Sequence, residues 1–202
     1  MSAYASGLSA RNGARDGDPL PPEPASADSA REALRRVAAG VTVFTVNADG
    51  RRHGTTVSAV AAMSREPLIL GGCLRRAGSF AEMVRGTGLF SVNVLAGTQS
   101  TLARRFADPD RPVGDAQFAG LPWFTDPRTG APLIRGSLAH LACRTLRWHP
   151  VGDYDLLLAE VIGGEAGRGM PVLSFAGQLH SASVAPVHEP SPTIGTPTSE
   201  VS

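Results

Sequence analysis

A short segment in the first half of the sequence combines residue types that can hold a phosphate group. It reads Leu74-Arg75-Arg76-Ala77-Gly78-Ser79 and joins a predicted strand to a predicted helix. Two guanidiniums, a glycine that admits unusual backbone angles and a serine at the helix start provide charged donors and free backbone N–H groups. A phosphate-binding turn is one interpretation, and a solvated strand-to-helix turn is the other.

A second segment offers backbone groups instead of charged side chains. Residues 54–66, GTTVSAVAAMSRE, follow a predicted strand and contain several small side chains. Small side chains let backbone N–H and C=O groups approach a flat heterocycle and bind its edge. Small residues also fill turns for steric reasons, so this segment alone leaves both interpretations open.

The other reactive side chains form no metal or nucleophile pattern. Cys73 and Cys143 lie in predicted strands without CxxC spacing, which favours reduced core residues over a zinc site. The histidines are scattered, and His140 alternates with apolar neighbours as a hydrogen-bonded residue of a strand would. Motifs of Rossmann dehydrogenases, P-loop proteins, α/β-hydrolases and zincins are absent, which disfavours those classes.

Composition narrows the class of partner. All 19 basic residues are arginines, and the 18 acidic residues leave a net charge of +1, which favours neither nucleic acid nor an anionic membrane. No apolar run reaches the roughly 20 residues that cross a bilayer, and no basic and apolar leader opens the chain. We expect a cytoplasmic protein that binds no nucleic acid and no membrane.

The chain is long enough for one core domain flanked by two polar ends. Residues 1–27 and 185–202 have no hydrophobic period, so neither end buries enough apolar surface to offset the entropy of ordering. We expect a disordered N-terminal arm, a folded domain at 28–184 and a disordered C-terminal tail.

Strand patterns dominate the folded domain. The capping-box spacing of Ser29 and Glu32 predicts a short amphipathic helix with Leu34 and Val37 on its apolar stripe. Turn residues between two β-branched runs, 41–46 and 55–60, predict a hairpin. Further strands are predicted at 67–74, 89–94, 137–148, 155–162 and 171–180, and a helix is predicted at 79–85.

A third helix is predicted after Thr98, which can serve as its N-cap. This helix would place Leu102 and Phe106 one turn apart. A loop rich in Pro, Gly and Asp then runs to about Pro132. Strands joined by turns, with only three short helices, indicate a mainly β antiparallel barrel. A doubly wound sheet would need a crossover helix after nearly every strand.

Taken in order, these segments resemble the flavin reductase family with the FMN-binding split-barrel fold, from about Leu34 to Ser181. The matching series is GVTVFTV at 40–46, GTTVSAV at 54–60, EPLIL at 66–70, FSVNVLAGTQSTLARRFA at 90–107, GAPLIRGSLAHLACR at 130–144 and HPVGDYDLLLAEV at 149–161. The resemblance implies a Greek-key split β-barrel with a few short flanking helices. It also implies an NAD(P)H:flavin oxidoreductase that transfers hydride from NADH or NADPH to FMN or FAD.

The resemblance further implies a homodimer with the flavin near the subunit interface, and a separate flavin-dependent monooxygenase that receives the reduced flavin. In the family the loop after the TVSA-type strand lines the isoalloxazine ring, and the end of the next strand contacts the phosphate. The cofactor-binding residues implied here are Val60, Ala61, Ala62, Arg75, Arg76, Gly78, Ser79 and Phe106. The family's Gly-Asp-His signature, whose histidine lies near the nicotinamide, reads Gly152-Asp153-Tyr154, so Asp153 and Tyr154 are the predicted catalytic residues.

The sequence departs from the family pattern at several pocket positions. Ala61-Ala62 replace the usual Thr-Ser, Gly78 replaces a serine, Tyr154 replaces the histidine and Ser174 replaces a frequent tyrosine. Each lost neutral hydrogen bond weakens flavin binding by about 0.5–1.5 kcal/mol. Hydride transfer itself is chemistry of the two cofactors and requires no general base from the protein.

Two other functions are therefore considered. In one, the barrel has lost or altered its redox activity and binds another polycyclic or aromatic molecule as a cyclase, isomerase or carrier. In the other, it stores or delivers flavin without turning over pyridine nucleotide, because Tyr154 occupies the nicotinamide space.

Overall fold

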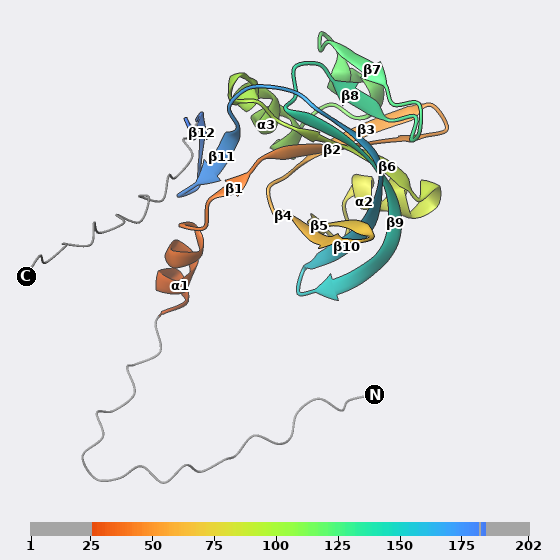
Figure 1. Cartoon of the computed structure of the whole chain (residues 1–202). Coiled ribbons are helices and arrows are strands. Elements are labelled where there is room, and N and C mark those ends of the chain that lie inside the picture. Colours follow the sequence, from red (N-terminus) through yellow and green to blue (C-terminus); the bar gives the residue numbers. More distant parts are fainter. Residues whose placement is uncertain (1–25, 182, 185–202) are drawn as a thin grey trace, which may run out of the picture.

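The computed structural model describes residues 26–181 together with residues 183 and 184 (Figure 1). The predicted C-terminal tail and nearly all of the predicted N-terminal arm lie outside the described residues. None of the described helices is long and apolar enough to span a membrane.

A seven-stranded antiparallel sheet curls into an open barrel with the strand order β3-β2-β6-β9-β10-β5-β4 (Figure 1). Its strands are β2 (Thr42–Ala48), β3 (Arg51–Val57), β4 (Val60–Arg65), β5 (Leu68–Arg75), β6 (Leu89–Val94), β9 (Ala139–Val151) and β10 (Tyr154–Ala166). β9 and β10 are 13 residues long and form the longest hairpin of the sheet. The strands β3 and β4 are the two edges.

Two smaller sheets and a few helices surround this barrel. The small sheets comprise β1 (Ala39–Gly40) with β11 (Val172–Phe175) and β12 (Gln178–Ser181), and β7 (Trp123–Thr125) with β8 (Pro132–Ile134). The helices are α1 (Ala27–Leu34), α2 (Ser79–Thr87), α3 (Ser100–Ala107) and the 3₁₀ turns η1 (Gly97–Gln99) and η2 (Gly114–Phe118). The mainly β antiparallel barrel with few helices is confirmed.

The hydrophobic core has two parts. In the first, Phe44, Phe80 and Phe90 pack as an aromatic trio between α2 and the sheet, with ring centroids 5.3–6.0 Å apart. In the second, Phe106 and Phe118 pack between α3 and the other face of the sheet. Each part fixes one helix on the barrel, and α3 is the helix that borders the candidate site.

The first helix differs from the sequence prediction. Its N-cap is Ser26, whose hydroxyl accepts a bond from the Ser29 N–H at 3.1 Å, so Ser29 lies inside the helix. The predicted apolar stripe meets no core, because Leu34 is 71 % exposed and Val37 is 69 % exposed. α1 projects from the barrel in Figure 1 and contacts it at its end, where the Arg35 carbonyl accepts from Ala176 N–H.

Three further predictions are corrected. Gln99, and not Thr98, is the N-cap of α3, because the 3₁₀ turn η1 comes first. The predicted single strand at 171–180 is a hairpin that turns at Ala176-Gly177, both with positive φ. The predicted loop before Pro132 contains η2 and β7, which the Pro and Gly content concealed.

Candidate functional site

A cavity of about 430 Å³ lies where the end of β3, α3 and the β11–β12 hairpin meet. Its polar lining comprises Thr56, Ser58, Arg104, Ser174 and Gln178, and its apolar lining comprises Val41, Ala103, Ala107 and Leu179. Thr56 and Ser58 are two residues apart on an extended segment, so both face the same side. A cation, several hydroxyls and an apolar wall suit an amphipathic ligand that carries a negative charge.

Two close contacts hold α3 over this cavity. The Thr56 hydroxyl donates to the Ala103 carbonyl at 2.7 Å. Next to it, Gly54 leaves space for the Phe106 ring, because a Cβ at position 54 would stand only 2.6 Å from the ring. The missing side chain at Gly54 therefore lets α3 approach β3 closely enough for Arg104 to line the cavity.

The connection from β3 to β4 leads from the cavity to the rest of the predicted site. The Ala59 carbonyl accepts from the Cys73 N–H at 2.9 Å, which fixes the connection against β5. Val60 is half-buried against the aromatic core, whereas Ala61 and Ala62 are exposed. Of the three side chains predicted to contact the flavin ring, those of Ala61 and Ala62 are exposed and can contact a ligand. The side chain of Val60 packs against the hydrophobic core.

Strand register places Ala61 and Tyr154 on one face of the sheet. Ala61 is paired with Gly71, and Tyr154 is paired with Arg75 on the same strand, β5. Directly paired residues share a face, and so do positions 71 and 75, which are four residues apart. Tyr154 is half-buried, and the neighbouring Asp153 is exposed in the β9–β10 turn.

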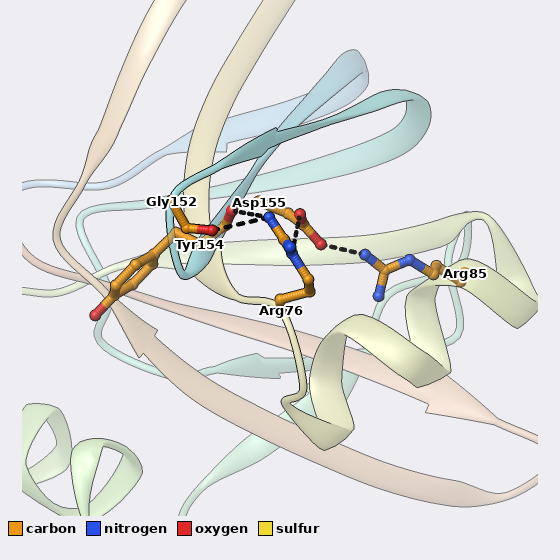
Figure 2. A network of polar contacts seen from close by, with 5 residues as sticks. All are labelled: Arg76, Arg85, Gly152, Tyr154 and Asp155. Carbon is orange, nitrogen blue, oxygen red and sulfur yellow. Dashed lines mark hydrogen bonds and ion pairs between the residues drawn. The ribbon is translucent and has the colours of Figure 1, made fainter. Parts of the chain in front are cut away.

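The two arginines of the predicted phosphate turn have different surroundings. Arg76 lies in an internal network, where it donates to the carboxylate of Asp155 and to the carbonyl of Gly152 (Figure 2). Arg75 is exposed, and no described residue forms an ion pair with it. These contacts occupy part of the Arg76 guanidinium, whose side chain is 51% exposed, so phosphate binding by Arg76 and by Arg75 stays a prediction.

Gly78 and Ser79 stand at the start of α2. Gly78 is the N-cap, and a Cβ there would meet the Arg75 carbonyl oxygen at 3.3 Å, a tight contact that a small shift would relieve. Ser79 borders a different hollow of about 600 Å³, together with Asp49, Arg51 and Glu82. The structure therefore does not bring Ser79 to the cavity beneath α3.

Phe106 is the clearest correction among the predicted cofactor residues. Its ring is completely buried and packs against Phe118 at 5.4 Å. A ring without exposed surface cannot contact a cofactor, so Phe106 belongs to the core and supports α3. The prediction instead missed Thr56, Ser58 and Arg104, although all three lie in segments that carry the family resemblance.

The two cysteines and His140 have the surroundings of structural residues. Both cysteines are free, and burial, followed by the charge of Asp126, raises the pKa of Cys143 to about 12. His140 bonds through Nε2 to the Ile134 carbonyl at 2.8 Å, as expected of a wall residue. Among the described residues no group of His, Cys, Asp or Glu side chains is arranged to hold a metal ion.

Comparison with known proteins defines the class. Residues 34–183 match the family described as flavin reductase like domain, and the chain belongs to this family. A curated relative named NADPH-flavin oxidoreductase, from Streptomyces viridifaciens, is 39% identical over 74% of this chain and 78% of its own length. The reductase subunit HsaB of a flavin-dependent monooxygenase from Rhodococcus jostii is 33% identical over 73% of this chain and 74% of its own length.

Solved structures agree with this assignment. BorF, the flavin reductase component of a bacterial two-component tryptophan halogenase, superposes with a TM-score of 0.73 and 30% identity, over 78% of this chain and 99% of its own. The NADH:FAD oxidoreductase SgcE6 of Streptomyces globisporus, in complex with NAD and FAD fragments, gives a TM-score of 0.72 and 28% identity. It covers 80% of this chain and 94% of its own. The predicted family and barrel are confirmed.

Proposed function

We propose that this protein is a flavin reductase that transfers hydride from NADH or NADPH to FMN or FAD. The observation that carries the proposal is the cavity beneath α3, where Thr56, Ser58 and Arg104 line one space in a member of this family. The curated relatives named as NADPH-flavin oxidoreductase and as FMN reductase (NADH) support the same activity.

The cavity fits the polar tail of a flavin. Arg104 provides the charge for a phosphate, and the Ser58 hydroxyl can donate to a phosphate or ribityl oxygen. The Thr56 hydroxyl donates to the Ala103 carbonyl, so towards a ligand it can only accept, as from a ribityl hydroxyl. Val41 and Ala107 add apolar lining to the same cavity. In this proposal the phosphate end of the flavin lies beneath α3, with Arg104 in the role that the sequence suggested for Arg75 and Arg76.

The connection from Ser58 to Ala61 leads away from this cavity and presents backbone groups and small side chains to the ring. Tyr154 and Ala61 share a face of the sheet, so the ring and the nicotinamide would lie on that face. When bound here, the flavin would supply the hydride acceptor and the nicotinamide the donor, so the transfer is chemistry of the two cofactors. The residues of this chain bind and orient the two rings, and Tyr154 restricts the space of the donor.

The proposal includes the partners of the reaction. Relatives that are components of two-component oxygenase or halogenase systems support delivery of reduced flavin to a separate flavin-dependent monooxygenase. A cytoplasmic homodimer is proposed as well. The edge strand β4 supports the homodimer, because no described strand pairs with its outer edge. The same strand carries the exposed side chain of Met63.

A binding titration and a turnover assay together test the function. The full-length protein is titrated with FMN and with FAD, and NADH and NADPH oxidation is then followed with each flavin present. The proposal expects flavin binding and flavin-dependent oxidation of at least one donor. Binding without oxidation would instead indicate a flavin store, and the absence of binding would favour another aromatic ligand.

A further inference from the structure

The carboxylate of Asp155 is buried between two arginines. Asp155 is 3% exposed, its Oδ1 accepts from the Nε of Arg76 at 3.1 Å, and its Oδ2 pairs with Arg85 of α2. The Arg85 guanidinium in turn lies over the Trp148 ring at 4.4 Å from its centroid. A buried carboxylate is tolerated only when it is paired, so these contacts fix both guanidiniums.

The same Arg76 side chain also bonds to the β9–β10 turn. Its second amino group donates to the Gly152 carbonyl at 2.9 Å and to the Tyr154 carbonyl at 3.5 Å. The Arg76 backbone N–H donates to the Asp153 carbonyl at 3.4 Å. Arg76 therefore contacts three successive backbone carbonyls, and Gly152 has the left-handed φ of +59° that lets the turn present them.

We propose that Arg76 is a positioning residue for Tyr154, with its guanidinium aligned by Asp155 and Arg85. Figure 2 shows the Tyr154 ring pointing away from this network, so Arg76 acts on the ring only through the backbone of the turn. The inference rests on the proposed function, in which Tyr154 borders the space of the hydride donor. A shift of the turn would move the ring within that space and leave the cavity beneath α3 intact.

The test substitutes Arg76→Gln in the full-length protein, because Asp155 then keeps Arg85 as its partner. We expect the KM for NADH or NADPH to rise about fivefold or more, with the Kd of FMN changed less than about twofold. Arg144→Gln is the matched control. Arg144 pairs with Glu160 at 2.7 Å across the same two strands, but far from the turn, so both constants should stay unchanged. Arg76→Lys keeps the positive charge but loses the planar, forked set of donors of the guanidinium. Its KM for the hydride donor should lie between those of the wild type and Arg76→Gln.

Each outcome decides the proposal. A raised Kd for FMN with an unchanged donor KM would place Arg76 at the flavin phosphate and overturn it. Equal effects of the Arg76→Gln and Arg144→Gln substitutions, or no effect of either, would also overturn it. If the wild-type protein reduces no flavin, the proposed function fails. Amide hydrogen exchange at residues 152–155 then tests, without any catalytic measurement, whether Arg76 holds the turn in place. Faster exchange in Arg76→Gln than in Arg144→Gln supports it, and equal exchange contradicts it.

Discussion

His53 is a buried imidazole that the proposed reaction does not use. It is 7% exposed, its Nδ1 lies 3.0 Å from the amide nitrogen of Gln117, and its Nε2 lies 3.2 Å from Arg111. Burial, followed by the charge of Arg111, lowers the pKa of His53 to about 4. The imidazole is therefore neutral at physiological pH and joins β3 to the segment that contains η2.

This shift makes stability depend on pH. The unfolded chain takes up a proton near pH 6.5, while the folded chain does so only near pH 4. The stabilisation of the folded state by neutral His53 is complete above pH 6.5. It is lost as the pH falls to 4, which lowers the free energy of unfolding by up to about 3 kcal/mol. In urea unfolding across this pH range, the free energy of unfolding of the wild type should fall. Most of that fall should be absent in His53→Gln. The exposed His149→Gln is the control, and an unchanged slope in His53→Gln would contradict the assignment.

The arginine that holds the flavin phosphate can be identified by a paired substitution. A charge-assisted hydrogen bond contributes about 1.5–3 kcal/mol, which corresponds to about tenfold or more in affinity. We expect Arg104→Ala to raise the Kd of FMN by that factor, and Arg75→Ala to change it little. Fluorescence titration of both variants measures this directly, and the reverse order would place the phosphate at the start of α2.

At the scale of elements, the contact between β3 and α3 shapes the cavity. Gly54→Ala would place a Cβ within 2.6 Å of the buried Phe106 ring, so the helix must shift outward. Such overpacking costs about 1–3 kcal/mol. We expect a lower melting temperature together with weaker FMN binding, because Arg104 moves with the helix.

Gly40→Ala is the matched control for that substitution, since a Cβ at position 40 meets nothing within 4 Å. Thermal unfolding and FMN titration of the two variants separate the effects. If Gly54→Ala lost stability but bound FMN like the wild type, the position of α3 would not control the site.

The elements also show what the sequence could predict. Local signals were sufficient for the β2–β3 hairpin, where the turn residues Asp49-Gly50 adopt positive φ, and for β6 with its predicted bounds. They failed where long-range contacts decide. The partner of Arg76 is Asp155, 79 positions later, and nothing in the local spacing of the arginine turn reveals that pair. The burial of Phe106 against Phe118 was concealed for the same reason.

At the scale of the molecule, we expect a homodimer that pairs through the side of the barrel bearing β4 and β5. Met63 and Leu68 on these strands are 51% and 56% exposed, and a subunit contact on this side would cover them. Light scattering should give a dimer for the wild type and a smaller mass for Met63→Glu combined with Leu68→Glu. A wild-type monomer at micromolar concentration would contradict the dimer, and an unchanged dimer in the variant would place the interface elsewhere.

The central claim is hydride transfer to a flavin held by this barrel, and anaerobic stopped-flow spectroscopy tests it most directly. The protein is saturated with FMN or FAD, mixed with NADH or NADPH, and the loss of oxidised-flavin absorbance is recorded for the wild type and for Tyr154→His. We expect reduction by at least one donor in the wild type, and faster reduction in Tyr154→His, because the smaller imidazole opens the donor space. Absence of reduction in both proteins with every pairing of flavin and donor would contradict the claim.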